Sequence, residues 1–350
     1  MEAQKIMTNK AITIYDIAKE AGVSPATVSR VLTNSANVRK DKKEKILYLI
    51  DKYDFKPNAL AKGLSNTKSK VIGIVAADVR NPYYAEVFVA CEIAARKEGY
   101  TVSLCNSLDI LEREIEQLEV LREQRVDVII QLGGSADDSI SNKEYVDKVN
   151  RVAQTIPIVV TGKLDGTDCY QVQIDTKEAA ECVLEYLIEL GHTEIAMVGG
   201  TQEVLSTYEK TQHYREIFER HGIPFREDYL VEGSYDIATG YQGMNSLLDN
   251  GKVPTAVIAI NDFSAVGVLH SITEHGYKIP EDISVVSYDN TYITELYLPN
   301  ITSIDYNYQL FGEQLVKTAI DAVEKKDIPR LQKITPTLMV RGSSGPVKTK

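Results

Sequence analysis

Several features that would assign this chain to a familiar class are missing from its 350 residues. No apolar run reaches the length of a membrane-spanning helix, so we expect no membrane association. The opening residues, MEAQKIMTNK, lack the apolar core of a signal peptide, and we therefore expect a cytoplasmic location. The four cysteines are widely spaced without a C-x-x-C motif, which favours reduced core residues over disulfides or metal ligands: Cys91, Cys105, Cys169 and Cys182.

Motifs of catalysis are missing as well. The sequence contains no G-x-S-x-G, no H-E-x-x-H, no Walker loop and no G-x-G-x-x-G after an expected strand. Its five histidines show no metal-ligand spacing. The histidine of GHTEIAMVGG precedes an expected strand, where a structural turn is a better interpretation than a catalytic base. We therefore expect no catalytic residue, no metal and no cofactor.

Acidic residues outnumber basic ones, with 50 Asp and Glu against 39 Lys and Arg, and a net charge of −11 argues against a nucleic-acid partner for the chain as a whole. The distribution of the charges reverses that conclusion. Residues 1–70 hold 14 basic and 7 acidic side chains, a net charge of +7, whereas the remaining 280 residues carry −18. A basic N-terminal module on an acidic body is typical of a small DNA-binding head.

The most informative stretch is residues 12–34, ITIYDIAKEAGVSPATVSRVLTN, which predicts two short helices joined by a tight turn. Thr13 can cap the first helix, and Asp16, three residues later, can complete a capping box. Gly22 ends this helix. Its buried face is expected to consist of Ile14, Ile17, Ala18 and Ala21.

Ser24 caps the second helix, and Pro25 occupies the first helical position, where its missing N–H has no cost. The apolar side chains of Val28, Val31 and Leu32 point inward, so the opposite face is small, polar and basic. A recognition helix needs such a face to approach base edges in a DNA groove. A helical hairpin packed on a larger domain is the alternative. The exposed face consists of Pro25, Ala26, Ser29 and Arg30.

A third helix is predicted at about residues 40–53, with Ile46, Leu47 and Ile50 as its apolar stripe. Its lysines are expected either to follow the phosphate backbone of DNA or to form a solvated charged face. The three helices form a module of about fifty residues, which is marginally stable alone.

Residues 55–70, FKPNALAKGLSNTKSK, predict a linker with a very short helix, Ala59–Leu64, which Asn58 can cap. Such a helix is unstable in isolation, so we expect it to form only against a partner, such as its twin from a second subunit on DNA. Leu64, an apolar residue in a basic linker, fits a wedge pushed between base steps of the minor groove. Packing of Leu64 on the body domain is the alternative.

From Val71 onward, short apolar runs alternate with helical segments. Fully apolar strands that alternate with helices indicate parallel sheets covered on both faces. There are too many units for one sheet, and the pattern restarts near residue 171, which predicts two similar doubly wound lobes. The expected strands are VIGIVAA, TVSLCN, VDVIIQL, IPIVVTG, EIAMVGG, TAVIAI and ISVVSY.

Ligands of open parallel sheets bind beyond the carboxyl ends of the strands, which places a site in the cleft between two facing lobes. Carboxylates, amides and aromatic rings at these ends suit a sugar, which they bind through its hydroxyl groups and by stacking. The same residue types are also ordinary turn formers. The candidates after the expected strands are Asn81, Pro82, Tyr83, Tyr84, Asn261, Asp262, Asp289 and Asn290.

The stretch D-I-A-K-E-A-G-V-S-P-A-T-V-S-R-V-L closely resembles the signature that opens members of the LacI/GalR family of bacterial transcriptional regulators, and the resemblance extends to LMVRGSSG near the C-terminus. It implies an α/β protein with an N-terminal helix-turn-helix head plus hinge helix, then two doubly wound periplasmic-binding-protein-like lobes between which the chain crosses three times. The implied domains are a LacI-type DNA-binding domain (11–56), a hinge helix and linker (57–69), and an effector-binding and dimerisation domain (70–343).

The resemblance also implies which residues contact DNA. Arg30 can donate two hydrogen bonds to guanine, whereas Pro25 and Ala26 offer only apolar contact. Thr33 stands where many members have Asn. The implied base-reading residues are Pro25, Ala26, Ser29 and Arg30, and the implied contacts to the DNA backbone are Tyr15, Ser24, Thr27, Asn37 and Tyr53. The implied hinge contacts are Asn58, Ala61 and Leu64, of which the leucine matches the minor-groove wedge of the family.

In the cleft, the resemblance implies effector contacts from both lobes. Asp289 matches an acid that binds effector hydroxyls or ring nitrogens, Asn261 matches a polar contact, and Tyr235 matches an aromatic ring that stacks on the effector. With Asn81 and Tyr84, which the strand-end rule nominates, the expected effector-binding residues are Asn81, Tyr84, Ser206, Lys210, Tyr235, Asn261 and Asp289.

The sequence departs from the family pattern at three positions of the cleft. Lys210 stands where the family often has Arg, and a lysine is a point charge rather than a bidentate fork. His213 stands where many members have Gly, and Gly162 where several have an acidic effector contact. These departures leave the effector open.

The leading hypothesis is a dimeric repressor of carbohydrate-utilisation genes that binds a palindromic operator in double-stranded DNA and a sugar or sugar phosphate effector. A second hypothesis, from a subgroup of catabolite-control regulators, is activation by serine-phosphorylated HPr, although Leu298 stands where that subgroup offers an arginine to the partner. A sugar-binding protein without a DNA role is a third reading, which the basic head opposes. An enzyme on the same scaffold is a fourth, which no catalytic motif supports.

Overall fold

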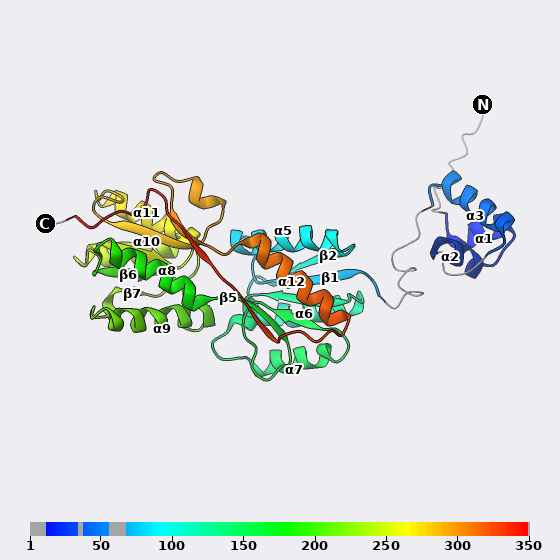
Figure 1. Cartoon of the computed structure of the whole chain (residues 1–350), viewed down its shortest axis with the longest axis horizontal. Helices are drawn as coiled ribbons and strands as arrows, with labels where there is room; N and C mark the ends of the chain where they lie inside the picture. Colours follow the sequence, from blue (N-terminus) through cyan, green and yellow to red (C-terminus); the bar gives the residue numbers. More distant parts are fainter. Residues whose placement is uncertain (1–11, 34–37, 56–67, 349–350) are drawn as a thin grey trace, which may run out of the picture. The chain divides into compact units, whose positions relative to one another are not determined.

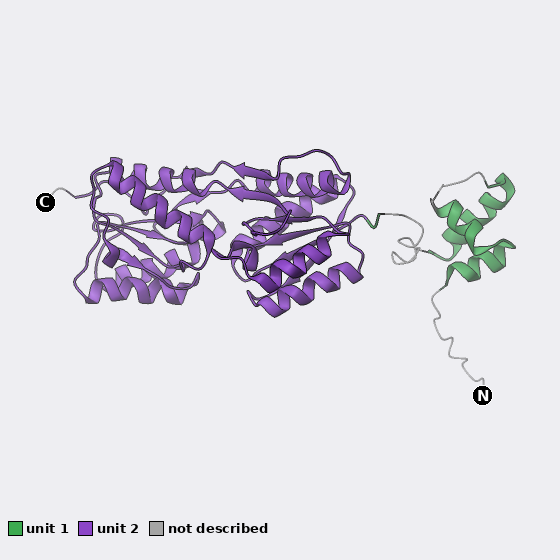
Figure 2. Cartoon of the chain, turned by 90° about the horizontal axis from the view of Figure 1, so that it is seen from below, with its two compact units in different colours: residues 1–69 green, residues 70–350 purple. Residues whose placement is uncertain are grey.

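The computed structural model describes residues 12–33, 38–55 and 68–348. The chain divides into two compact units, residues 1–69 and residues 70–350 (Figure 1, Figure 2). Four of the predicted DNA contacts lie outside the described residues: Asn37, Asn58, Ala61 and Leu64. Most of the predicted hinge also lies outside them.

The described part of unit 1 contains α1 (Ile14–Ala21), α2 (Pro25–Thr33) and α3 (Lys40–Lys52). The predicted capping box of α1 is present, because the Asp16 N–H donates to Thr13 Oγ1 and the Thr13 N–H donates to the Asp16 carboxylate at 2.9 Å. Gly22 ends α1 in the left-handed region, with φ +72°. The core of the unit consists of Ile17, Ala18, Ala21, Val28, Val31, Ile46 and Leu49.

The apolar face of α3 differs from the prediction at one residue. Ile46 is fully buried as expected, but Leu47 is 47% exposed, and Leu49 takes its place in the core with 3% exposure. Successive helical residues point about 100° apart, so Leu49 lies on the same face as Ile46 whereas Leu47 turns away from it. The prediction for Leu47 is therefore wrong.

Unit 2 consists of two lobes, each built on a six-stranded sheet (Figure 1). The lobe 1 sheet is parallel throughout, and its strands lie in the order β11 (Leu331–Ile334), β5 (Tyr170–Ile174), β4 (Ile158–Val160), β3 (Val128–Leu132), β1 (Val71–Ala76) and β2 (Thr101–Asn106). The lobe 2 sheet has the order β12 (Thr337–Met339), β10 (Thr302–Asp305), β9 (Ser284–Asp289), β8 (Ala256–Ala259), β6 (Ile195–Val198) and β7 (Leu230–Val231), with only β12 antiparallel.

Helices cover both faces of each sheet, which explains why the strands are apolar on both sides. In lobe 1, one face packs against α5 (Pro82–Lys97) and α12 (Tyr308–Val323), and the other against α6 (Leu111–Glu123) and α7 (Lys143–Ala153). In lobe 2, one face packs against α8 (Thr176–Glu189) and α9 (Leu205–Arg220), and the other against α10 (Ile237–Asp249) and α11 (Asp262–Glu274). Short helical turns are η1 (Gly134–Asp137), η2 (Glu227–Tyr229) and η3 (Tyr292–Glu295).

The chain passes between the lobes three times, as the resemblance implied: from β5 to α8, from β10 to α12, and from β11 to β12 (Figure 1). One expectation is corrected. The pattern was expected to restart near residue 171, but β5 (Tyr170–Ile174) is hydrogen-bonded to β4 and β11 in lobe 1, and the second sheet begins at Ile195. Pairing with residues 331–334, which are distant in sequence, determines where β5 belongs.

The cysteines and His192 have the structural surroundings that the sequence predicted for them. All four cysteines are free: Cys91 and Cys169 are buried, and Cys105 and Cys182 are half-buried. The His192 ring nitrogens lie 3.0 Å from Thr255 Oγ1 and 3.0 Å from the Gly345 carbonyl, as expected of a histidine that holds a turn. Within the described ranges, no helix combines the length and the apolar character needed to cross a membrane.

Candidate functional site

A cavity of about 600 Å³ lies between the two lobes, at the carboxyl ends of both sheets. Its volume is in the range of small-molecule sites. All of the residues predicted to contact an effector line this one cavity: Asn81, Tyr84, Ser206, Lys210, Tyr235, Asn261 and Asp289.

The α5 end of the cavity is aromatic. Asn81 caps α5, because its Oδ1 accepts a hydrogen bond from the Tyr83 N–H at 3.1 Å. The rings of Tyr83 and Tyr84 meet edge to face with centres 5.0 Å apart, and Tyr306 of lobe 2 lies 6.0 Å from Tyr83. Gly133 permits this arrangement, since a Cβ there would lie 2.3 Å from the Tyr84 hydroxyl. The lobe 1 wall therefore presents fixed ring surfaces.

On the lobe 2 wall, Asn261 and Tyr235 are bonded to each other. Asn261 caps α11 by accepting from the Ser264 N–H at 2.8 Å, and its Nδ2 donates to the Tyr235 carbonyl at 3.0 Å. The Tyr235 hydroxyl lies 2.7 Å from that of Thr207. Asn261 thus fixes the Tyr235 backbone beside the cavity, and Thr207 contacts the hydroxyl of the Tyr235 ring.

Two charged side chains of the cavity are more than nine-tenths buried: Lys210 is 6% exposed and Asp289 is 8% exposed. Lys210 Nζ lies 4.2 Å from the centre of the Tyr288 ring. Among the described residues, none donates a hydrogen bond to the Asp289 carboxylate. Burial raises the pKa of Asp289, with repulsion from Asp262 adding to the effect, and burial lowers the pKa of Lys210. Asp289 has φ +96°, a strained backbone for a residue with a side chain, and such strain gathers at functional sites.

Asp262 lies behind this wall and fixes the turn that carries Asp289. Its buried carboxylate accepts from the Ser287 hydroxyl at 2.5 Å, from the Ser303 hydroxyl at 2.9 Å, and from the N–H and hydroxyl of Thr291 at 2.6 and 2.8 Å. These bonds join the end of β9 to β10 and η3. Sequence reasoning placed Asp262 among the ligand candidates, whereas the structure gives it this supporting role.

Besides Asp78, which is paired with Arg80, three acidic residues of lobe 1 line the cavity and were not among the predicted contacts: Asp109, Asp137 and Asp138. Asp109 follows β2, and the other two follow β3. The rule that ligands bind beyond the carboxyl ends of parallel strands also nominates these acids, because they follow the second and third strands of lobe 1. Burial raises the pKa of Asp137 to about 6, although a hydrogen bond from Ser206 acts in the opposite direction and lowers it.

The segment that carries two of these acids also joins the lobes. Ser206 Oγ donates to the Asp137 carboxylate at 2.8 Å, and the Ser139 N–H donates to the Glu203 carbonyl at 2.7 Å. Asp138 and Val204 form an antiparallel bridge between the same two stretches of chain. One side of the cavity is therefore closed by direct contact between η1 and the start of α9.

Gly162 lines the cavity at the position where the resemblance implied an acidic contact, and the structure explains the glycine. A Cβ at this position would lie 2.0 Å from the Ala136 carbonyl oxygen. No side chain fits there unless the η1 backbone moves, so the lobe 1 wall has no acid after β4.

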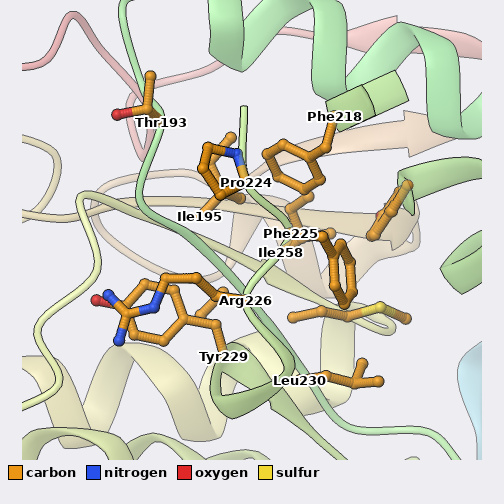
Figure 3. A pocket seen from close by; sticks show the side chains of 12 residues that line it. Thr193, Ile195, Phe218, Pro224, Phe225, Arg226, Tyr229, Leu230 and Ile258 are labelled. Atoms are coloured by element: carbon orange, nitrogen blue, oxygen red, sulfur yellow. The ribbon is translucent and has the colours of Figure 1, made fainter. Parts of the chain in front are cut away.

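A second hollow in lobe 2 has a volume of only about 20 Å³ and holds none of the predicted residues (Figure 3). Aromatic side chains that include Phe218, Phe225 and Tyr229 line it, and the Arg226 guanidinium lies 3.8 Å from the centre of the Tyr229 ring. The space is about that of one water molecule, so it is not a ligand site.

In unit 1, the predicted DNA contacts differ in exposure. Arg30, Ala26 and Ser24 are exposed, and Tyr15 is 70% exposed, whereas the half-buried residues are Pro25, Thr27, Ser29 and Tyr53. Ser24 caps α2, because its Oγ accepts a hydrogen bond from the Thr27 N–H at 3.3 Å. The hydroxyl groups of Ser24 and Thr27 also lie 2.9 Å apart.

Tyr53 has a structural partner that the sequence did not indicate. Its hydroxyl donates to Glu20 at 2.8 Å, and Lys52 Nζ lies 3.0 Å from the same carboxylate. These bonds tie the end of α3 to α1. A contact of Tyr53 with DNA therefore competes with a bond that holds the head together.

Two family models match the chain: "Bacterial regulatory proteins, lacI family" over residues 13–58 and "Periplasmic binding protein-like domain" over residues 184–344. Catabolite control protein A of Priestia megaterium is 32% identical over 84% of this chain and 87% of its own length. The HTH-type transcriptional repressor PurR of Haemophilus influenzae strain PittEE is 30% identical over 95% of this chain and 98% of its own. The crystal structure of a lac repressor dimer bound to operator and the anti-inducer ONPF matches with a TM-score of 0.86 and 25% identity, over 96% of this chain and all of that one.

Proposed function

Because this chain belongs to the LacI family of bacterial regulatory proteins and is a DNA-binding transcriptional regulator, we propose that it represses carbohydrate-utilisation genes under the control of a small sugar-type effector. It acts in the cytoplasm as a homodimer on a palindromic operator. The lac repressor, crystallised as a dimer on its operator, supports this arrangement. We assign DNA binding to residues 11–56, the hinge to 57–69, and effector binding and dimerisation to 70–343.

The exposed face of α2 supports the DNA-reading half of the proposal. Arg30 and Ala26 are exposed beside a core that holds Val28 and Val31 inward, so the helix can enter a groove without losing its packing. The Arg30 guanidinium reads guanine, and Ala26 contacts a thymine methyl. In the proposal, the hinge contacts Asn58, Ala61 and Leu64 act only when two subunits meet on DNA.

The single observation that carries the effector half is the convergence of all seven predicted effector contacts on one cavity of about 600 Å³. They come from both lobes, so a bound ligand changes the contacts between the lobes. The bonds from Ser206 to Asp137 and from Ser139 to Glu203 lie beside it. A shift of these contacts is the two-state element through which the effector controls the hinge.

The experiment that tests the proposal begins with selection of DNA from a random-sequence duplex pool by the full-length chain. The selected palindrome is labelled, and its fluorescence anisotropy is followed while sugars and sugar phosphates are titrated. We expect one small sugar to change the Kd for the operator. Equal binding of selected and scrambled duplexes would contradict the DNA-reading half.

Arg30→Ala provides the matched DNA variant. It should weaken binding to the selected palindrome by roughly 1–3 kcal/mol and flatten the preference for one base. Arg39→Ala, on an exposed residue outside the predicted contacts, is the control and should leave base preference unchanged. Equal effects of the two substitutions on base preference would remove Arg30 from the reading role.

A second candidate function is global catabolite control through serine-phosphorylated HPr, which the 32% identity to catabolite control protein A favours. Leu298, where that subgroup offers an arginine, is 87% exposed and provides no charge for a phosphoprotein. Adding phosphorylated HPr to the anisotropy experiment distinguishes this function from control by a sugar effector. Tighter operator binding with the phosphoprotein alone would replace the sugar-effector proposal.

A further inference from the structure

The lobe 1 wall of the cavity is acidic. Of the four carboxylates that the described residues place there, only Asp78 is in an ion pair, with Arg80 Nε at 3.0 Å and Nη2 at 2.5 Å. Burial raises the pKa of Asp109, and the neighbouring Asp78 adds to the rise; burial and then Asp109 raise the pKa of Asp138. The carboxylates of this wall are therefore close enough to repel one another.

Lobe 2 adds three carboxylates, Glu209, Asp236 and Asp289, and one cation, Lys210. Arg80, the other cation among the described residues that line the cavity, is already paired with Asp78. Glu209 accepts from the Thr176 hydroxyl at 2.7 Å, and Asp236 caps α10. The Asp289 carboxylate is more than nine-tenths buried, faces the cavity, and receives no hydrogen bond from any described residue. Arg80 balances Asp78 and Lys210 can balance one further charge, so the remaining carboxylates leave the cavity with a negative excess.

The excess does not fit a metal ion. Within the described part of the chain, no three His, Cys, Asp or Glu side chains converge closely enough to hold one. The carboxylates are instead spread around a cavity with the Tyr84 and Tyr235 rings in its wall. Carboxylates combined with aromatic rings attract an organic ammonium group, through charge and through the ring faces. A phosphate group in the same cavity meets like charges on both walls.

We propose that the effector carries a protonated amine on a polyhydroxylated frame, as in an amino sugar, and that phosphorylated sugars are excluded. This inference rests on the proposed function, because it takes the cavity to be the effector site. The ammonium group lies on the lobe 1 wall, against Asp109 and Asp138. The hydroxyl groups face Asp289 and Lys210 of lobe 2, which keeps the two cations apart.

The test is isothermal titration calorimetry of the full-length chain with matched probes. These are glucosamine, galactosamine and mannosamine, each compared with its parent hexose, its N-acetyl derivative and the corresponding hexose 6-phosphate. We expect at least one amine to bind about tenfold more tightly than its parent, with affinity that falls as salt is added. The proposal is overturned if a 6-phosphate binds more tightly than the matching amine, or if no amine exceeds its parent at millimolar concentration.

Two variants locate the ammonium group. Asp109→Asn and Asp138→Asn should each reduce the preference for amine over parent hexose several-fold, while binding of the parent changes little. Asp147→Asn, an exposed carboxylate of α7 outside the cavity, is the matched control and should leave the preference unchanged. Unchanged preference in both cavity variants would overturn the assigned position.

Operator binding without ligand separates this inference from the proposed function. A chain that binds its selected palindrome but prefers phosphorylated sugars retains the regulatory function and loses the amine. A chain that binds no specific duplex loses the regulatory function, whatever its ligand preference.

Discussion

The two lobes share one strand order but present different chemistry at the cavity. In each sheet the fourth strand of the lobe ends at the cavity: β4 is followed by Gly162 in lobe 1, and β9 ends at Asp289 in lobe 2. Asp289 needs a strained backbone, and Gly162 needs the absence of a side chain. The shared strand order thus fixes where a ligand lies, whereas the residues after each strand decide what it contacts.

The lobes also differ in how they support their walls. Each buries one carboxylate behind the cavity: Glu114 in lobe 1 and Asp262 in lobe 2. Asp262 accepts four bonds of 2.5–2.9 Å, whereas Glu114 accepts longer bonds from the Ser135 N–H at 3.1 Å and the Ser107 hydroxyl at 3.4 Å. Lobe 2 therefore holds its wall more firmly than lobe 1.

The largest expected effect comes from Asp262→Ala. It leaves the Thr291 N–H and the hydroxyls of Ser287 and Ser303 without their acceptor, which should lower the free energy of unfolding by about 4 kcal/mol. Urea unfolding of the variant and of Glu114→Ala measures the contrast. An equal loss in both variants would contradict the view that lobe 2 is the more firmly held.

Glu114→Gln should reveal the weaker support of lobe 1 as a pH dependence. Burial raises the pKa of Glu114 to about 7 from its ordinary 4.5, so the folded state binds more protons than the unfolded state between these values. The stability of the natural chain therefore falls, through this group, as pH rises from 4.5 to 7. Glutamine removes that loss, so the variant should gain up to about 3 kcal/mol relative to the natural chain above pH 7.

Unfolding curves at about pH 5 and about pH 8, on either side of the raised pKa, measure this gain. Glu116→Gln, at an exposed position of the same helix, is the control and should leave the free energy of unfolding unchanged. A difference between Glu114→Gln and the natural chain that stays constant with pH would show that Glu114 titrates normally.

Much of the fold could be predicted because its signals are local. The capping box of Thr13 and Asp16 and the apolar run that begins at Val71 depend only on neighbouring residues. The position of β5 could not be predicted, because it depends on pairing with residues 331–334. In the site, the strand-end rule found Asn261 but not Asp109, because the rule gives the edge of the sheet and does not tell which loops at that edge face the cavity.

Glu114 marks the limit of sequence reasoning. It lies in the charged helix LEREIEQLEVLRE, where an acidic residue ordinarily faces solvent. Its burial arises from η1, which folds over it and brings the Ser135 N–H to its carboxylate. No local pattern indicates that a turn 21 residues further along covers this helix.

Gly162→Ala tests whether steric hindrance explains why position 162 carries no acidic side chain. A methyl group 2.0 Å from the Ala136 carbonyl oxygen forces η1 to move, which should cost about 2 kcal/mol in the free energy of unfolding. Gly345→Ala is the matched control, because its Cβ would meet Pro280 only at the ordinary distance of 3.4 Å. Equal stability of the two variants in urea would mean that lobe 1 has room for a side chain after β4.

Ser206→Ala should have the smallest effect and tests whether the lobes depend on each other. It removes the 2.8 Å bond from Ser206 to Asp137 but leaves the bond from the Ser139 N–H to the Glu203 carbonyl. Loss of one partly buried hydrogen bond costs about 1 kcal/mol, so the Ser139 amide should exchange with deuterium about fivefold faster. Ser103→Ala, whose hydroxyl bonds only within lobe 1, should leave that exchange rate unchanged. Unchanged exchange in Ser206→Ala would mean that the backbone bridge alone joins the lobes.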